Sequence, residues 1–433
     1  MLQLSELIPL VLGFINKSGV TLPLLHHALA LFGNLTQLCP QECLAFPDMI
    51  DFLIACVRSA DMHSRFYALG AVIRLQVPEQ GRLVGDPNAL LAAMQRGLPS
   101  HLNRLLEEYG PERCESFLTL QSSAEYQKAM MQCAQDRDLY KLGHTIARLI
   151  PRNEFSISEG GFQAINKFTG KPEFADVGLP FKMWVDALPV CAKAIRERGK
   201  PGEEDFADML DMKFFVLRSR ISEAIVIAKR GVERNPKLPY PYYIMTLGDD
   251  LETGLRCAKK GLKCKNVTPF VSHALRARAT EIAGDLAISR MQGSTVGDQK
   301  WEHGQAFLNS ALEDAQMYLA QAPPDMRHRK SMIYWCTILT LAKKGPELST
   351  DLREFQVKPF SPSPYVFPCR HLTYLILAEV HRHAKDCRRV LQRVRFRPAE
   401  ISAPLCTRAY LFTLRRCSQE MGRSCCTARH TQR

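Results

Sequence analysis

Apolar residues in the first 76 positions recur at intervals of three and four, which is the spacing of one face of an α-helix. The pattern predicts helices over residues 22–38, 47–58 and 62–76. A short polar break separates the last two, and the side chain of Ser59 or Asp61 is placed to cap the helix that follows. We therefore expect the first part of the chain to be a series of packed helices.

The helical pattern continues over residues 88–150. Within this stretch, Ser122 or Ser123 is followed closely by Glu125, which fits a capping box and predicts that a helix begins there. The pattern stops at Pro151, because proline cannot continue a helix.

Residues 152–182 have no sustained periodicity and are rich in glycine, proline and aromatic residues. Such a composition predicts a long loop with a short pair of strands, and it marks the best candidate for a domain boundary. The Thr-Gly-Lys sequence in this stretch is not a phosphate-binding loop, because Pro172 stands where that loop requires serine or threonine.

A degenerate repeat follows. The segment 223–236 aligns with 253–266, so that Ala224, Ala228 and Gly231 fall on Gly254, Ala258 and Gly261. A third copy, 310–323, aligns Ala311, Ala315 and Pro323 but carries the bulky Tyr318 at the third small position. Small residues at fixed places in a helix set how closely a neighbouring helix can approach. The repeat therefore predicts paired, closely packed helices.

Two families share these patterns. The stretch HSRFYALGAVIRL, residues 63–75, resembles the long packing helix of armadillo repeats, and residues 26–38 look like an earlier copy of it. The fourteen residues 223–236 resemble the second helix of a tetratricopeptide repeat, with Pro236 as the stop. Both resemblances imply helical units that stack because one unit alone cannot bury its apolar face.

Taken together, the patterns predict an all-α fold, an α-solenoid of stacked helix pairs in two parts. Armadillo-like helical repeats are expected over 1–150, an irregular loop or linker over 151–204 and tetratricopeptide-like helices over 205–345. Residues 346–433 are expected to hold a proline-rich linker, a basic helix and a disordered tail.

The composition is that of a globular protein able to bury a core, with 46% hydrophobic and 23% charged residues among 433. The apolar run LIPLVLGFI near the start is too short to span a bilayer and lacks the flanks of a secretory signal. We therefore expect a cytoplasmic or nuclear protein that has no membrane partner.

The fifteen cysteines include no Cys-x-x-Cys pair. Most stand alone in apolar helical patterns, as at Cys56, Cys133, Cys191 and Cys336, which is typical of reduced, buried thiols. Near the end of the chain, five residues could be considered as zinc ligands: Cys406, Cys417, Cys425, Cys426 and His430. Their spacing does not suit a tetrahedral site, so neither zinc nor any other cofactor is expected.

The succession of armadillo-like and tetratricopeptide-like helices also resembles fungal proteins in which such helices precede a MYND-type zinc finger. The Cys-x-x-Cys pairs of that finger are not present in this sequence. The resemblance therefore implies a finger that is missing or altered, and it leaves a degenerate zinc-finger protein, with metal binding, as an alternative function.

The net charge of +13 is concentrated near the carboxyl end. Residues 382–433 contain thirteen basic and three acidic residues, a net charge of +10. A tail of this charge can bind nucleic acid or an acidic protein surface. A nucleic-acid-binding or chromatin-associated protein is therefore a second alternative function.

No set of catalytic residues can be identified. His26 and His27 lie in a predicted helix, with one expected to point inward, and Asp249 and Asp250 are interpreted as a helix cap. No nucleophile occupies an elbow-like context and no dinucleotide fingerprint occurs, so an enzyme is not expected.

Stacked helical repeats form grooves suited to peptides or helices, and the sequence therefore predicts a protein-interaction scaffold. The predicted binding faces are the grooves of 1–150 and 205–345. Five basic residues are candidates for contact with an acidic partner: Lys259, Lys260, Lys263, Arg276 and Arg278.

Overall fold

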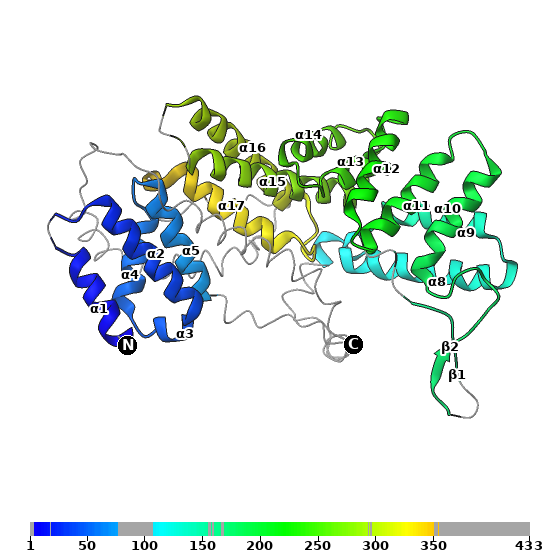
Figure 1. Ribbon diagram of the computed structural model, residues 1–433, viewed down its shortest axis with the longest axis horizontal. Helices are drawn as coiled ribbons and strands as arrows, with labels where there is room; N and C mark the ends of the chain where they lie inside the picture. Colours follow the sequence, from blue (N-terminus) through cyan, green and yellow to red (C-terminus); the bar gives the residue numbers. More distant parts are fainter. Residues whose placement is uncertain are drawn as a thin grey trace. The chain divides into compact units, whose positions relative to one another are not determined.

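The computed structural model describes residues 4–76 and 107–349, apart from short gaps at 18, 155–156, 158–159, 166–168, 293 and 295–296, together with residue 354. In these ranges the chain is an all-α fold in which consecutive helices pack on one another (Figure 1). This is the predicted α-solenoid of stacked helix pairs in two parts. None of the described helices is both long and apolar enough to span a bilayer.

The chain divides into two compact units. Unit 1 takes its described residues from 1–100, 287–312 and 333–433, and unit 2 takes its own from 101–286 and 313–332. The contiguous ranges predicted from the sequence differ from these units. The reason is that Leu341 and Leu348, late in the chain, belong to the hydrophobic core of the first helices.

Unit 1 begins with five helices: α1 (Leu4–Ile15), α2 (Leu22–Leu38), α3 (Pro40–Cys43), α4 (Pro47–Val57) and α5 (Met62–Gln76). The predicted ranges 22–38, 47–58 and 62–76 are thereby confirmed to within one residue. Asp61 is the cap of α5, since its Oδ2 accepts a hydrogen bond of 2.7 Å from the amide of Ser64. Leu25, Leu29, Phe32 and Leu53 fill the core between these helices.

Two arginines of unit 1 tie its first helices to its last segment. Arg65 donates to the carbonyl oxygens of Ser59 and Ala60, in the turn between α4 and α5, and to that of Ala342. Arg58 donates to the carbonyl oxygen of Leu348 over 2.6 Å. These bonds satisfy backbone oxygens that helix ends would otherwise leave unpaired.

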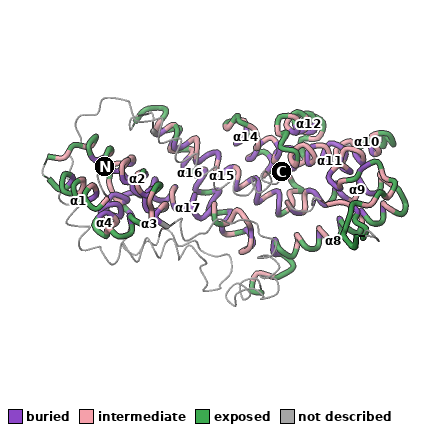
Figure 2. The backbone as a smooth tube through the Cα atoms, turned by 60° about the horizontal axis from the view of Figure 1, so that its bottom comes forward, coloured by how far each residue is buried: buried purple, intermediate pink, exposed green. Residues whose placement is uncertain are grey.

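Unit 2 is built mainly of helices: η2 (Pro111–Arg113), α8 (Glu115–Asp136), α9 (Leu139–Leu149), η3 (Trp184–Asp186), α10 (Ala187–Arg198), α11 (Glu204–Leu217), α12 (Ile221–Arg234), α13 (Pro239–Met245) and α14 (Leu251–Gly261). Three longer helices contain residues of both units: α15 (Pro269–Gln292), α16 (Gln299–Gln321) and α17 (Arg329–Lys344), the last followed by η4 (Gly345–Glu347) in unit 1. Figure 2 shows buried positions alternating with exposed ones along the helices, as expected of elements with one inward face.

The small residues of the predicted repeat lie where helices meet. Ala224 and Ala228 in α12 and Ala258 in α14 are completely buried. At Gly261 a methyl group would lie only 2.9 Å from Cβ of Tyr242 in α13. Glycine at this place therefore lets α13 and α14 approach closely.

The segment 151–204 departs from the prediction in its last third. The short strands β1 (Gln163–Ile165) and β2 (Pro172–Phe174) pair antiparallel, as expected of the loop. The rest of the segment is not the irregular linker that was predicted, because residues 187–198 form the helix α10. Its inner face, Leu188, Cys191 and Ile195, is fully or almost fully buried.

The predicted helix start at Ser122 is wrong. The helix α8 begins seven residues earlier, and Ser122 is buried inside it. Its first turn is capped from elsewhere in unit 2, since the carboxylate of Asp325 accepts hydrogen bonds from the amides of Glu115 and Ser116. A cap that comes from a distant segment leaves no local sequence signal.

Candidate binding surfaces

Two of the five predicted basic contact residues are used within unit 2. Nζ of Lys259 lies 2.5 Å from the carboxylate of the buried Asp314. Arg278 pairs with Glu281 at 2.8 Å and also donates to the carbonyl oxygen of Thr246. These two cations hold helices together and are not left over for a partner.

A third, Arg276, is half-buried on α15, and its Nε has no hydrogen-bond partner in the described structure. It lies close to His273, which is buried. Burial, with a smaller contribution from the Arg276 charge, lowers the pKa of His273 to about 4. The imidazole is therefore neutral at physiological pH.

The remaining two candidates, Lys260 and Lys263, form an exposed basic surface at the end of α14. The charges of Lys260, of Arg256 one turn earlier and of Lys229 in α12 all act on the thiol of Cys257. Neither Lys260 nor Lys263 has an ion-pair partner among the described residues. Both ammonium groups are therefore open to solvent.

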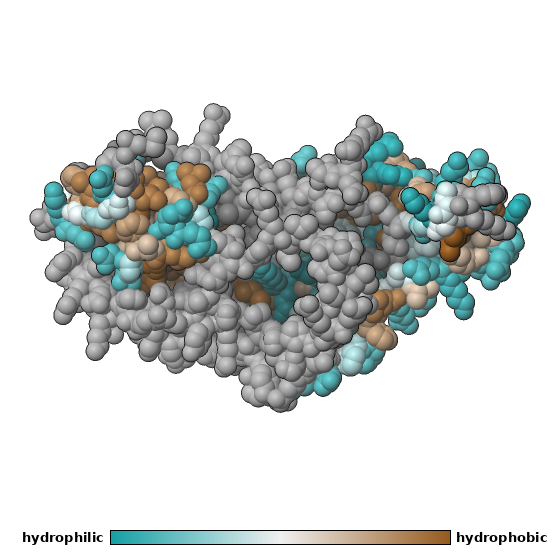
Figure 3. Space-filling model, turned by 90° about the horizontal axis from the view of Figure 1, so that it is seen from below, coloured by the Kyte–Doolittle hydropathy of each residue, from teal (hydrophilic) through white to brown (hydrophobic). Residues whose placement is uncertain are grey.

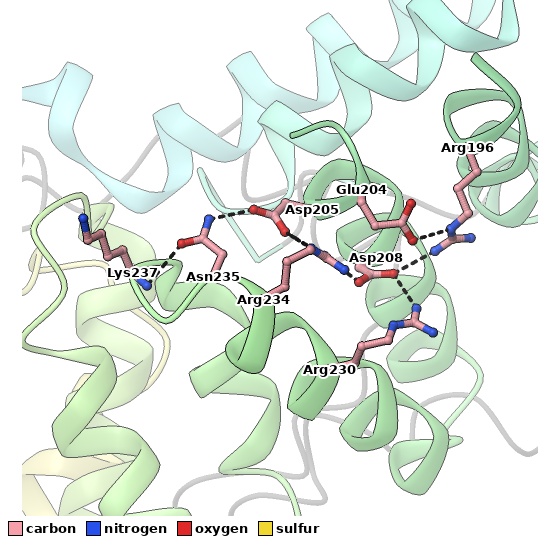
Figure 4. Close-up of polar contacts among 8 residues, drawn as sticks. All are labelled: Arg196, Glu204, Asp205, Asp208, Arg230, Arg234, Asn235 and Lys237. Carbon is pink, nitrogen blue, oxygen red and sulfur yellow. Dashed lines mark hydrogen bonds and ion pairs between the residues drawn. The ribbon is translucent and has the colours of Figure 1, made fainter. Parts of the chain in front are cut away.

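A network of polar contacts surrounds Asp208 of α11 (Figure 4). Only 1% of this side chain is exposed, and it accepts hydrogen bonds from Arg196, Arg230 and Arg234 over 2.7–2.8 Å. Arg196 comes from α10 and the other two come from α12. One carboxylate therefore ties three consecutive helices together.

Further acids complete this network. Arg196 also pairs with Glu204 and Asp211, and Arg234 also pairs with Asp205. Burial alone would raise the pKa of Asp208, but the hydrogen bonds from the arginines outweigh burial and hold that pKa below its ordinary value. Because acids and arginines neutralise one another here, the network is a structural clamp and not an open anion site.

A short segment between α9 and β1, Pro151–Glu154, lies against several helices of unit 2. The carbonyl oxygen of Glu154 accepts a bond from Lys213 of α11, and its carboxylate pairs with Arg327 at 3.1 Å. The hydroxyl of Thr268 donates to the carbonyl oxygen of Pro151. This segment therefore joins α11 to residues near the starts of α15 and α17.

The buried amide of Asn153 connects this segment to α8. It donates to Glu115 over 2.8 Å and accepts from Thr119. Burial raises the pKa of the Glu115 carboxyl to about 7, and the nearby charge of Asp325 acts in the same direction. The hydrogen bond from Asn153 opposes the shift without cancelling it.

The opposite face of α8 carries an apolar row that is open to solvent and is interrupted by the exposed Lys128. Phe117, Leu120 and Met131 are 45%, 61% and 50% exposed, and Ala124 between them is also exposed. At 100° per residue, Phe117, Leu120 and Met131 lie within an arc of about 60°. Hydrophobic surface open to solvent is also visible on the described residues in Figure 3.

The inner face of the same helix is firmly held. Tyr126 is fully buried, donates to the carbonyl oxygen of Trp184 and meets its indole edge-on at 5.7 Å. Arg152 donates to both carboxylate oxygens of Glu125 on the flank of α8. The apolar row therefore lies on a helix whose inner face and flank are held by contacts within unit 2.

In unit 1, His26 and Asp61 lie 2.8 Å apart, which agrees with the expectation that one of the two histidines points inward. His27 is exposed. Burial works against the ionised form of Asp61, but contacts with His26 and Ser64 outweigh burial and lower its pKa. The pair fastens the cap of α5 to α2 and brings no nucleophile with it.

The cysteines predicted to be buried, Cys56, Cys133, Cys191 and Cys336, are all buried. Burial raises the pKa of Cys133 to about 11, so this thiol is unreactive at neutral pH. Within the described ranges, no three His, Cys, Asp or Glu side chains are placed to hold a metal ion. The zinc candidates Cys406, Cys417, Cys425, Cys426 and His430 lie outside those ranges.

Asp250 is confirmed as a helix cap, since its carboxylate accepts a bond of 3.0 Å from the amide of Thr253 at the start of α14. The apolar row on α8 was not anticipated, because a helix start placed at Ser122 leaves Phe117 and Leu120 outside the helix. The spacing of Phe117, Leu120, Ala124 and Met131 is the signal that could have revealed it.

No family model, curated protein or solved structure matches this chain.

Proposed function

We propose that this protein is a protein-interaction scaffold whose partner is an amphipathic helix or peptide. The observation that carries the proposal is the apolar row on α8, formed by Phe117, Leu120, Ala124 and Met131. Exposed apolar side chains scattered singly are common on protein surfaces, but a row along one helix face is typical of an interaction site. The armadillo-like and tetratricopeptide-like resemblances of the sequence support the same class of function.

The row has the dimensions of a helix-binding site. Phe117 and Met131 are fourteen positions apart, which corresponds to ~21 Å along the helix. Apolar anchors at spacings of three, four and seven residues are how one helix recognises the groove or face of another. The row lies inside the range 1–150, in which the sequence places one of the two binding faces.

A library of displayed helical peptides, selected on the full chain, tests this function. Peptides selected on the unaltered protein should bind the double variant Phe117→Glu/Leu120→Glu at least about tenfold more weakly, because two anchors are replaced by charges. The control is Val226→Glu, which places a charge at an isolated apolar residue of α12 that is 67% exposed. Thermal unfolding of each variant shows that the fold is retained.

Equal binding to the double variant would reject α8 as the site. Acidic peptides whose binding is lost in Lys260→Glu/Lys263→Glu would instead place the partner on the basic surface of α14. Selection of no peptide above background would count against the scaffold function itself.

The proposal assigns no catalytic role, and it places the protein in the cytoplasm or the nucleus, which a fluorescent fusion would test. Nucleic-acid binding through residues 382–433 concerns a part of the chain outside the described residues and stays a prediction from charge. Steeply salt-dependent binding of DNA or RNA, lost when residues after 370 are removed, would favour that alternative.

A further inference from the structure

The first helix of unit 1 has one buried and one open face. Ile8 and Ile15 of α1 are 0% and 5% exposed and belong to the core of the unit. On the outward face, Glu6, Leu10 and Gly13 follow one another at intervals of four and three, and Lys17 continues the row four residues later. Lys17 lies in the turn that prolongs the helix, where its amide bonds to the carbonyl oxygen of Phe14.

The centre of this outward face is apolar. Leu10 is 53% exposed and Phe14 is 50% exposed, with exposed Pro9 beside them. Gly13 has open space in front of it, since a methyl group added there would meet no atom within 4 Å. A glycine between exposed apolar side chains lets another helix approach closely.

The charges sit at the two ends of the face. Glu6 is one turn before Leu10, and the ammonium of Lys17 lies over the ring of Phe14, 4.5 Å from its centroid. Both charged side chains are exposed and have no ion-pair partner among the described residues.

The outward face of α1 is self-complementary when the helix direction is reversed. Positions equally distant from the midpoint between Val11 and Leu12 form three pairs: Glu6 with Lys17, Pro9 with Phe14, and Leu10 with Gly13. When two copies of a helix pack antiparallel about a two-fold axis, each position meets its counterpart at the same distance on the other side of that midpoint. Opposite charges would then meet twice, and each leucine would face a glycine.

We propose that α1 is a homodimer interface, in which the outward faces of two copies pack antiparallel. Leu10 of each copy fills the space in front of Gly13 of the other, and Glu6 pairs with Lys17 across the axis at both ends. One helix pair buries less surface than a standard interface, so the dissociation constant should be on the order of 10–100 µM.

A second copy is favoured over a different partner because the charge pattern is self-complementary. The apolar row on α8 offers a comparison. Antiparallel pairing of two copies of α8 about Ala124 would place the ammonium of Lys128 against Leu120, with no acid to meet it. Exposed apolar residues alone therefore do not produce the match that α1 shows.

Sedimentation equilibrium of the full chain tests the proposal, at low salt and over about 1–200 µM, a range that brackets the expected constant. The unaltered protein should show a monomer–dimer equilibrium. Lys17→Glu alone, and Glu6→Lys alone, should each weaken dimerisation by about tenfold, because two attractive pairs become repulsive. The double variant Glu6→Lys/Lys17→Glu should restore it, since the attractive pairs return with their signs exchanged.

The control for the change in net charge is Lys193→Glu. Lys193 lies on α10 in unit 2, and its side chain is 78% exposed. It should leave the dimerisation constant unchanged. A protein that is monomeric throughout the range, single variants that dimerise normally, or a double variant that is not restored would each overturn the proposal. Peptide binding by α8 is independent of all these outcomes.

Discussion

Three arginines donate to the carboxylate of Asp208. The aspartate and its arginine partners differ in how far their side chains are exposed to solvent. The aspartate is 1% exposed, whereas the side chain of Arg230 is 57% exposed. A buried charge that loses its partner costs far more than an exposed one, because water cannot replace the lost contact. The importance of each residue in this clamp therefore depends on its burial and not on its number of bonds.

We predict that Asp208→Asn lowers the free energy of unfolding by about 3 kcal/mol, since the charge shared by three arginines is removed. Arg230→Gln should cost less than about 1 kcal/mol, because its exposed guanidinium returns to water. Urea unfolding at pH 7 measures both. The Asp208 contribution is present above the ordinary pKa of an aspartate and is lost only as the pH falls through its lowered pKa. Equal costs for the two variants would contradict the prediction.

Glu115 should make unit 2 less stable as the pH rises. Its carboxyl has a pKa of about 7 in the folded chain against 4.5 ordinarily, so between these values the folded state holds a proton that the unfolded state has released. Stability therefore falls from pH 4.5 to pH 7, by up to about 3 kcal/mol.

Glu115→Gln should remove this dependence while keeping an oxygen that can accept from Asn153. The variant should be more stable than the unaltered protein at pH 8 and similar to it at pH 4.5, as measured by urea unfolding at each pH. A gain of the same size at both pH values would show that ionisation is not the cause.

In unit 2, the size of single residues determines how closely paired helices approach each other. Gly231 of α12 and Gly261 of α14 hold equivalent places in the repeat, but their surroundings differ. A methyl group at Gly231 would lie 3.5 Å from Cγ of Pro241, an ordinary contact, whereas at Gly261 it would lie 2.9 Å from Cβ of Tyr242. Only the second position lacks room for a side chain.

Gly231→Ala should therefore stabilise the protein by about 0.5–1 kcal/mol, because alanine favours the helix. Gly261→Ala should destabilise it by about 1–2 kcal/mol, since the overpacking between α13 and α14 exceeds that gain. Thermal unfolding of the two variants measured side by side checks the difference in sign. A stabilising Gly261→Ala would show that the two helices move apart without cost.

Elements were predicted from the sequence where their signals are local. The boundaries of α2, α4 and α5 follow from apolar spacing and nearby proline, and the caps Asp61 and Asp250 stand next to the helices they serve. The start of α8 was missed because its cap, Asp325, lies 210 residues beyond Glu115.

Among the candidate binding residues, too, contacts with distant parts of the chain could not be predicted from the sequence. Lys259 and Lys260 are neighbours of the same residue type, yet Lys259 is paired with Asp314, 55 residues away, and Lys260 is exposed. Composition and periodicity cannot separate two such residues, because the difference depends on a tertiary contact.

At the scale of the whole molecule, unit 1 joins segments from both ends of the described chain. Leu341 and Leu348 lie in the core formed with Leu29, Leu53 and Leu69. We predict that Leu341→Ala, which leaves a cavity there, destabilises unit 1 by about 2–4 kcal/mol. Hydrogen exchange should accelerate in α2 and α5, and exchange in α10–α12 of unit 2 serves as the internal reference. Unchanged exchange in α2 and α5 would contradict the packing described.

The bond from Arg65 to the carbonyl oxygen of Ala342 joins residues 277 positions apart. At a synthesis rate of roughly 5–20 residues per second, about 14–55 s pass between the addition of Arg65 and the addition of Ala342. For most of that time the first five helices have already been made, while Leu341 and Leu348, which complete their core, have not. The amino-terminal helices therefore wait with part of their apolar surface uncovered, which makes them a natural substrate for a chaperone that acts on nascent chains.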